Sequence, residues 1–246
     1  MFKFFVKVGL IQVLIMFMFT FLDQMHHFYL RDIKGAASIK ITDAGRQMGG
    51  TGFGVHYKGH NYIMTNNHVC ELKRISPTGI WINMPNGSLV RAKILARYAK
   101  HDLCLIEHIE GISTLGLGSD PRLGETNYAI GYPQLQPKTL TSGEYVGTAE
   151  VQVVMDEART VEELHCKGGV VDYSPWMGAV CIRSYMAFFT TTPILGGSSG
   201  SPVVNSFGNL VGVAFAASAQ GNNWAKLVPL YAVRDFLESY TSKEKK

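Results

Sequence analysis

The sequence has 246 residues, of which 46% are hydrophobic and 17% are charged, and its formal net charge is +4. A chain of this length and composition can bury a full hydrophobic core, which excludes a disordered protein. Apart from a charged tail at residues 242–246 the basic residues are scattered, so we predict no nucleic-acid partner.

The first 23 residues form a separate hydrophobic segment. Between Val8 and Leu22 the only polar side chains are Gln12 and Thr20, two lysines precede this run, and Asp23 ends it. A basic flank before an apolar run is typical of a signal peptide or a signal anchor. No small-x-small cleavage motif follows the run, which favours an uncleaved anchor over a cleaved signal. A buried core helix is disfavoured because the run is apolar on every face. The positive flank predicts an extracytoplasmic domain, whether periplasmic, lumenal or secreted.

Short β-rich runs separated by turn signals fill most of the remaining chain. These runs lie at residues 37–41, 52–57, 62–65, 80–83, 89–97, 103–107, 128–130, 140–154, 180–189, 202–204 and 210–217. Many short strands at this spacing predict an all-β sandwich or barrel. The stretch at 107–125, which contains Gly-Ser-Asp-Pro, is the expected join between two barrels.

One helix is predicted near the end of the chain, at residues 229–240. Pro229 suits its first turn, where the missing N–H costs nothing. Apolar residues then recur at helical spacing along one face, namely Leu230, Val233, Phe236, Leu237 and Tyr240. We expect this face to dock on the barrels.

A glycine- and serine-rich run at residues 196–202 has the composition that an acyl-transfer nucleophile needs. Such a nucleophile requires an exposed hydroxyl on a tight turn and backbone N–H groups aimed at the developing oxyanion. A run of this kind is also typical of a plain loop. Here two predicted strands follow it directly, so the run belongs to a rigid scaffold.

Two further residues stand where a serine hydrolase needs a base and an acid. His68 follows the predicted strand at 62–65, at a strand-to-turn corner, although a lone histidine there is usually structural. Asp102 precedes the predicted strand at 103–107, where it could accept the imidazole N–H or act as an ordinary turn residue. The order His68, Asp102, Ser199 predicts a catalytic triad.

In these motifs the sequence resembles the trypsin-like serine proteases, and within them most resembles the HtrA/Deg branch. The similar segments are residues 50–55 with 65–68, the aspartate strand at 102–106, residues 123–133 with 140–143, and the serine motif at 197–202. The resemblance covers about residues 36–240. It implies a chymotrypsin-like fold of two six-stranded antiparallel β-barrels, at about 36–120 and 121–228, with the C-terminal helix at 229–240. The expected protease domain is 24–241, without a PDZ domain.

The resemblance also implies the roles of the site residues. Ser199 would be the nucleophile, His68 the base and Asp102 the residue that orients it, with the N–H groups of Gly197 and Ser199 forming the oxyanion hole. Ser198 stands where digestive proteases have Asp, so we do not expect activation by propeptide cleavage. No cofactor or metal is expected.

The substrate pocket implied by the resemblance is apolar. Pro193 would form its floor, and Phe215, Ala216 and Ala217 would form a wall. None of these residues is acidic, so we predict a preference for aliphatic side chains over Lys or Arg. Lys226 would change this preference if it pointed inward.

The implied function is that of a serine endopeptidase acting on a protein or peptide substrate through an acyl-enzyme. The alternatives are a catalytically silent protease-fold scaffold and a processing enzyme for a single substrate. Members of the HtrA/Deg branch often form trimers, so the resemblance allows a homo-oligomer.

Four cysteines in an exported chain permit two disulfides, with three connectivities, or four free thiols. Cys70 and Cys104 each lie two residues past a triad member, and we hypothesise a disulfide between them. A metal site at His165 and Cys166 is disfavoured, because the other histidines lack partners at ligand spacing.

Overall fold

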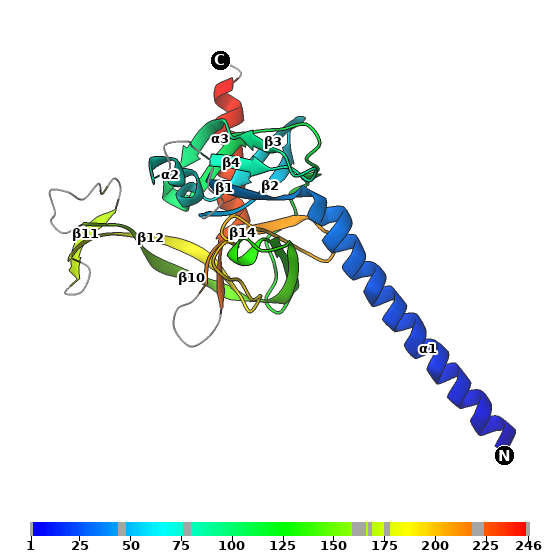
Figure 1. Cartoon of the computed structure of the whole chain (residues 1–246). Coiled ribbons are helices and arrows are strands. Elements are labelled where there is room, and N and C mark those ends of the chain that lie inside the picture. The colour runs from blue at the N-terminus through cyan, green and yellow to red at the C-terminus, as the bar shows by residue number, and fades with distance from the viewer. Residues whose placement is uncertain are drawn as a thin grey trace.

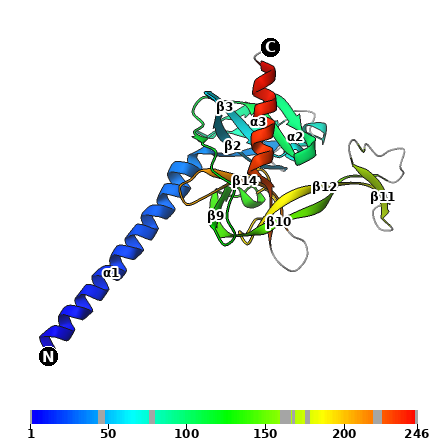
Figure 2. The same cartoon turned by 180° about the vertical axis from the view of Figure 1, so that it is seen from behind.

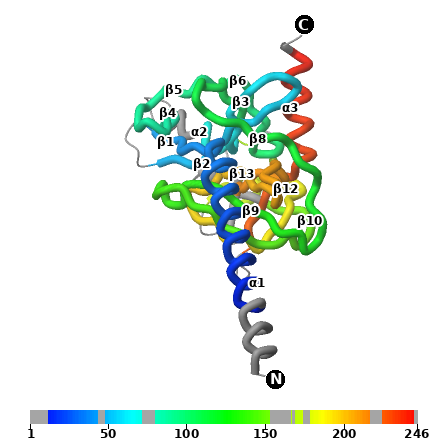
Figure 3. The backbone as a smooth tube through the Cα atoms, turned by 90° about the vertical axis from the view of Figure 1, so that its right-hand side faces the viewer, coloured from blue at the N-terminus to red at the C-terminus, as the bar shows by residue number. Residues whose placement is uncertain are grey.

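The computed structural model describes residues 2–43, 48–75, 80–158, 166, 169–174, 178–217 and 224–244 of the chain. Two β-sheets lie one above the other, and a long helix, α1 (Phe2–Phe28), projects away from them (Figure 1). The last helix, α3 (Leu230–Glu244), ends on the opposite side of the molecule from α1 (Figure 3). The predicted all-β fold, with one helix at each end of the chain, is confirmed.

The first sheet has eight strands in the described chain, in the order β5-β4-β1-β2-β3-β7-β6, with β8 paired in parallel to β2. Its strands are β1 (Ser38–Asp43), β2 (Gly49–Tyr57), β3 (His60–Thr65), β4 (Ile80–Asn83), β5 (Leu89–Arg91), β6 (Ile94–Tyr98), β7 (Leu103–Glu107) and β8 (Thr114–Leu115). A short helix, α2 (Asn67–Ile75), lies between β3 and β4.

The second sheet has seven described strands in the order β10-β9-β13-β14-β15-β12-β11, and β10 also pairs with β12. Its strands are β9 (Thr126–Gly131), β10 (Thr139–Ala158), β11 (Val170–Ser174), β12 (Gly178–Thr190), β13 (Pro202–Val204), β14 (Leu210–Ala217) and β15 (Ala225–Pro229). The far ends of β10 and β12 project from the body together with β11 and form an arm, visible from both sides (Figures 1 and 2).

The largest hydrophobic cluster joins the two sheets and helix α3. Phe53 and Leu105 from the first sheet, Val213 from the second, and Phe236 from α3 belong to this one cluster. The ring of Phe236 stacks on Tyr98 of β6 with the centroids 5.3 Å apart. The apolar face of the last helix therefore docks on the barrels as predicted, and it holds the two sheets in a fixed relation.

Several local predictions need correction. Among the residues that the structure describes, the sheets contain eight and seven strands rather than six each, because the short β5 and β8 and the edge strand β11 are added. His68 lies in the first turn of α2 and not at a simple strand-to-turn corner. Pro229 is the last residue of β15, and the helix begins one residue later.

Helix α1 continues without a break in the chain trace into the first sheet. A π-helical turn (Tyr29–Ile33) and a 3-10 turn (Lys34–Ala37) lead directly into β1. The described apolar side chains of α1 are exposed, and the helix is long and apolar enough to cross a membrane. Length and composition of this kind are shared by signal sequences, so they do not separate the two predicted roles.

Candidate active site

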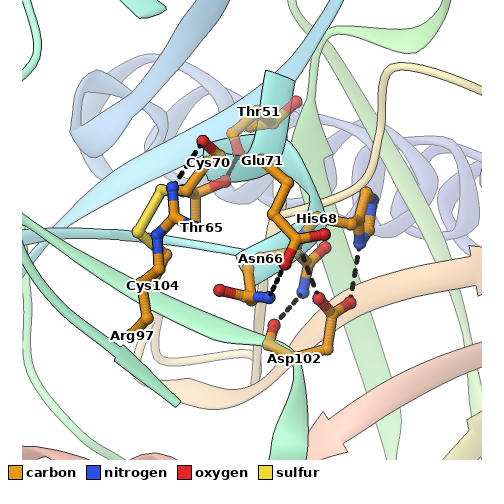
Figure 4. The surroundings of a disulfide bond; sticks show 10 residues. Thr51, Thr65, Asn66, His68, Cys70, Glu71, Arg97, Asp102 and Cys104 are labelled. Carbon is orange, nitrogen blue, oxygen red and sulfur yellow. Dashed lines mark hydrogen bonds and ion pairs between the residues drawn. A yellow bond between two sulfur atoms is a disulfide. The ribbon is translucent and has the colours of Figure 1, made fainter. Parts of the chain in front are cut away.

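Each of the two carboxylate oxygens of Asp102 forms a hydrogen bond with His68. The Nδ1 atom of His68 lies 2.7 Å from Asp102 Oδ2, and the backbone N–H of His68 donates to Asp102 Oδ1 over 2.9 Å (Figure 4). His68 comes from the first turn of α2, and Asp102 immediately precedes β7. The carboxylate thus holds both the ring and the backbone of the histidine.

Asp102 has a backbone conformation that few residues other than glycine adopt, with φ 53° and ψ 45°. Such a conformation persists only where the surroundings enforce it. The backbone carbonyl of Asp102 accepts hydrogen bonds from the Asn66 side-chain amide and from the Asn67 N–H, both over 3.0 Å. One residue further on, Leu103 begins a strand that pairs with β3 just before Asn66.

A disulfide joins the same two elements. Cys70 of α2 and Cys104 of β7 are bonded, with their Cα atoms 6.5 Å apart, so the hypothesised pairing is confirmed (Figure 4). The helix that carries His68 and the strand that follows Asp102 are therefore linked covalently, two residues beyond each of these side chains.

The two members of the pair differ in their exposure to solvent. The Asp102 side chain is 3% exposed, whereas that of His68 is 42% exposed. Burial opposes a positive charge on His68, but the Asp102 carboxylate and, less strongly, Glu71 outweigh it and raise the pKa of His68 above its usual value. Because Nδ1 faces Asp102, Nε2 is the atom that remains for proton transfer.

The loop carrying Ser199 packs tightly against the first sheet beside His68. A Cβ atom added to Gly50 would lie 2.7 Å from a methyl group of Val69 and 2.8 Å from the Ser199 carbonyl oxygen. Val69, the residue after His68, and the Ser199 loop therefore approach the backbone of residue 50 too closely to leave room for a side chain. This explains why residue 50 is glycine.

Thr51 connects the two sheets at this point. Its backbone N–H donates to the Ser199 carbonyl over 2.8 Å, and its hydroxyl donates to the Gly197 carbonyl over 2.9 Å. The same hydroxyl accepts a bond from the Tyr132 N–H over 3.0 Å, while Thr65 donates to the Thr51 carbonyl over 2.6 Å. Sequence reasoning used Thr51 only as part of a motif and did not detect this role.

Ser199 lies between glycines that both have φ near +85°, Gly197 and Gly200. The Gly200 N–H donates to Ala214 and the Ser201 N–H donates to Ser198. In the part of the chain that the structure describes, the N–H groups of Gly197 and Ser199 have no acceptor. The Ser199 hydroxyl itself donates to the Phe215 carbonyl over 3.3 Å, and no bond to His68 is formed among the described residues.

The orientation of the Gly197 N–H follows from the preceding peptide group. The Gly196 carbonyl accepts a hydrogen bond from the Gln134 N–H over 2.5 Å. The described chain has no cis peptide bond, so the Gly197 N–H points away from Gln134. The N–H groups of Gly197 and Ser199 are therefore available to a ligand.

Comparison with known proteins gives the family. Residues 50–213, which include His68, Asp102 and Ser199, match the trypsin-like peptidase domain. The chain belongs to the trypsin-like peptidase family.

The chain is also similar to individual HtrA proteases. It is 30% identical over 173 residues to the serine protease Do-like HtrA of Bacillus subtilis, covering 67% of this chain and 33% of the relative. It is also 30% identical over 198 residues to human serine protease HTRA4, covering 78% of this chain and 34% of that protein. The chain thus spans about a third of the length of these relatives.

Solved structures share the fold at lower identity. The inactive form of the Rv3671c protease matches with a TM-score of 0.61 and 16% identity, covering 85% of this chain and 90% of that one. The active form of the same protease, from Mycobacterium tuberculosis, also matches. A serine endoprotease from Yersinia pestis matches with a TM-score of 0.60 and 18% identity, covering 87% of this chain and 65% of that one. These matches agree with the predicted chymotrypsin-like architecture.

The four residues predicted to form a substrate pocket do not line one described cavity. Pro193 lines a cavity of about 320 Å³ together with Leu140 and Ser198. The Phe215 ring is buried and packs on Tyr185 with the centroids 5.4 Å apart. The side chains of Ala216 and Ala217 lie outside the described residues, as does the chain that follows them.

The disfavoured metal site also falls partly outside the described chain. His165 is not described, and Cys166 is bonded to Cys181 of β12 with the Cα atoms 5.3 Å apart. Within the described residues no group of three potential ligands from His, Cys, Asp and Glu comes together.

Proposed function

We propose that this chain is a serine endopeptidase with His68, Asp102 and Ser199 as its catalytic triad. The observation that carries the proposal is the 2.7 Å bond between His68 Nδ1 and Asp102 Oδ2, beside a tightly packed serine loop. This bond leaves His68 Nε2 to act as the base and matches the geometry that triads require. The substrate is a protein or peptide.

The reaction follows from these positions. Ser199 rotates away from the Phe215 carbonyl, transfers its proton to His68 Nε2 and attacks the scissile carbonyl carbon through Oγ. His68 then gives this proton to the leaving amine as the C–N bond breaks and an acyl-enzyme forms. Water, deprotonated by His68, hydrolyses the ester and restores Ser199. Groups of this kind acting together contribute a rate factor on the order of 10⁶.

The developing oxyanion is held by the N–H groups of Gly197 and Ser199. Their lack of acceptors among the described residues supports this role, because hydrogen-bond donors that are already in place need no reorganisation during the reaction. The Gln134–Gly196 bond helps to fix the first of these donors in position.

The specificity pocket is assigned to Pro193, Phe215, Ala216 and Ala217, which offer no acidic group. We therefore expect aliphatic side chains to be preferred over Lys and Arg before the cleaved bond. Cleavage-site profiling with a peptide library measures this preference, and a preference for basic residues would contradict the assignment.

Helix α1 is proposed to anchor the peptidase domain in a membrane, with the domain on the extracytoplasmic side. Its exposed apolar side chains, and the two lysines in its first two turns, Lys3 and Lys7, support this role.

A fluorophosphonate probe, which reacts with activated serines, tests the enzymatic proposal on the full chain in detergent. We expect labelling of the wild type and of Ser198→Ala, and no labelling of Ser199→Ala. Ser198 is the matched control because it is the neighbouring serine, and its hydroxyl makes one long contact of 3.4 Å with the Leu195 N–H. A folded wild type that is not labelled would favour the catalytically silent scaffold.

A further inference from the structure

The end of helix α1 is fastened to one turn of the second sheet, between β13 and β14. His26 Nε2 lies 3.0 Å from the Ser206 carbonyl, and the Tyr29 hydroxyl donates to the Phe207 carbonyl over 3.3 Å. The His26 ring also packs edge-on against Tyr128 of β9, with the centroids 5.5 Å apart. These contacts join the helix to the body at a fixed place.

The connection is reinforced by the residues that follow α1. Leu30 is completely buried in the core that joins both sheets. The aliphatic part of Lys34 lies against Gly208 of the same turn. No flexible linker separates the helix from the body, because a π-helical turn and a 3-10 turn lead straight into β1. The orientation of the body therefore follows the orientation of α1.

The turn at residues 205–208 is held by hydrogen bonds within it, yet it presents an exposed aromatic ring. The Asn205 side-chain oxygen accepts bonds from the N–H groups of Phe207 and Asn209, over 3.0 and 3.1 Å. The Phe207 side chain is nevertheless 76% exposed. Single exposed apolar residues are common on proteins, so exposure alone does not indicate a binding role for Phe207. Its position in the turn that contacts the end of α1 is the further observation.

The distance of this turn along α1 can be compared with the thickness of a bilayer. With Phe4 and Phe5 added to the apolar run and Lys7 snorkelling to the interface, residues 4–22 of α1 would be about 28 Å long at about 1.5 Å per residue, close to the roughly 30 Å of a hydrocarbon core. Asp23 follows this apolar run, and His26 lies three residues further, about 5 Å along the axis. The headgroup layer on each side is about 5–8 Å thick. The turn that contacts His26 therefore lies at headgroup depth.

We propose that Phe207 inserts into the headgroup layer of the bilayer that α1 crosses and so fixes the peptidase domain against the membrane surface. The inference rests on the proposed anchoring role of α1. A lipid surface is the occupant because the Phe207 backbone carbonyl accepts a hydrogen bond from Tyr29, directly after the helix whose exposed apolar side chains would face lipid, and Met25 and Phe28 expose further apolar side chains near the same end of α1. Helix α2, which carries His68, lies on the side of the body away from α1 (Figures 1 and 2).

Photo-crosslinking tests this inference with the full chain in phosphatidylcholine nanodiscs. The photoreactive residue p-benzoylphenylalanine is placed singly at positions 207, 19 and 173, and lipid adducts are counted by mass spectrometry. Phe19 in α1 and Tyr173 on the arm are 63% and 67% exposed, close to the value for Phe207. Unchanged melting temperatures show that the three variants are folded.

We expect lipid adducts at positions 19 and 207, and at least about tenfold fewer at position 173. Adducts at position 19 but not at position 207 would leave the anchor in place and overturn the docking of Phe207. Adducts at neither position would overturn the anchor and the docking together. Crosslinks from position 207 to a second copy of the chain, in place of lipid, would also overturn the lipid assignment.

Discussion

The two halves of the candidate active site are held in place by different means. His68 in α2 and Asp102 just before β7 both lie in the half of the molecule built on the first sheet, where two hydrogen bonds, a left-handed aspartate backbone and the Cys70–Cys104 disulfide fix them together. Ser199 belongs to the second sheet, and its loop reaches the first sheet mainly through Thr51. The acid–base pair is thus built within one sheet, whereas its position relative to the nucleophile depends on contacts between the sheets.

This difference has a consequence for catalysis. A base that is rigid within its own sheet is useful only if the serine loop is held at the correct distance from it, since an error of about 1 Å can cost about 100-fold in rate. The contacts of Thr51 should therefore affect the rate of catalysis as well as the stability of the fold.

The largest effect is expected where the two halves must act as one unit. His68→Ala and Ser199→Ala should each lower kcat by about 10⁶, and the double variant should lower it no further, because each change removes the same proton-transfer step. Single-turnover and steady-state rates on a peptide substrate measure this. His56→Ala, which removes an exposed histidine bonded to Asn61, should be neutral. Additive losses in the double variant would show that the two residues do not act as a unit.

Asp102→Asn should lower kcat by about 10⁴, since an amide favours the wrong histidine tautomer. The carboxylate also contributes to the raised pKa of His68, so in the wild type kcat/KM should rise with pH on a limb above the usual histidine value of about 6.5. In the variant that limb should move to lower pH. A pH profile of kcat/KM for both proteins measures the shift.

Glu107→Gln is the matched control for this change, because Glu107 is an exposed acid at the other end of β7, paired with Lys93. If the pH at which kcat/KM rises were the same in Asp102→Asn as in the wild type, Asp102 would not be what raises the pKa of His68.

A smaller effect is expected at the contact between the sheets. Thr51→Val keeps the shape of the side chain but removes its hydroxyl, which leaves the Gly197 carbonyl and the Tyr132 N–H without this partner. We expect kcat to fall about 10- to 100-fold while unfolding free energy falls by about 1–3 kcal/mol. Kinetics and urea unfolding measure the two quantities. Thr51→Ser retains the hydroxyl and should restore most of kcat; equal losses in both variants would assign the effect to packing.

The sequence predicted the parts of this comparison that have strong local patterns. The last helix was predicted because five apolar residues recur at helical spacing, and that face is buried. Helix α2 was missed because its nine residues are shorter than the window over which a helical period can be recognised. The order of His68, Asp102 and Ser199 was visible in the sequence, but the hydrogen bonds that position them were not.

The contacts between the sheets leave no local signal at all. Thr51 and Gly197 are 146 residues apart, and nothing near either residue indicates that they meet. The left-handed conformation of Asp102 is likewise imposed by Asn66 and Asn67 from another element. The arm formed by β10, β11 and β12 was not predicted as a unit: β10 and β12 extend beyond the runs expected at 140–154 and 180–189, and β11 was not expected at all.

The two disulfides give the mildest way to separate the structural contributions of the two regions. Cys70 and Cys104 close a loop with a sequence separation of 34, and replacing both with Ala should lower the unfolding free energy by about 2–4 kcal/mol. Because this bridge joins the His68 helix to the Asp102 strand, kcat should also fall, by roughly threefold to tenfold, as the pair becomes less rigid.

Replacing Cys166 and Cys181 with Ala removes a bridge on the arm, away from both halves of the site, and should leave kcat on a short peptide unchanged. Calorimetry and peptide kinetics on both double variants measure this contrast. If the arm variant lost as much kcat as the first, the arm would have to contribute to the active site, and rigidity within the first sheet would not be what sets the position of His68.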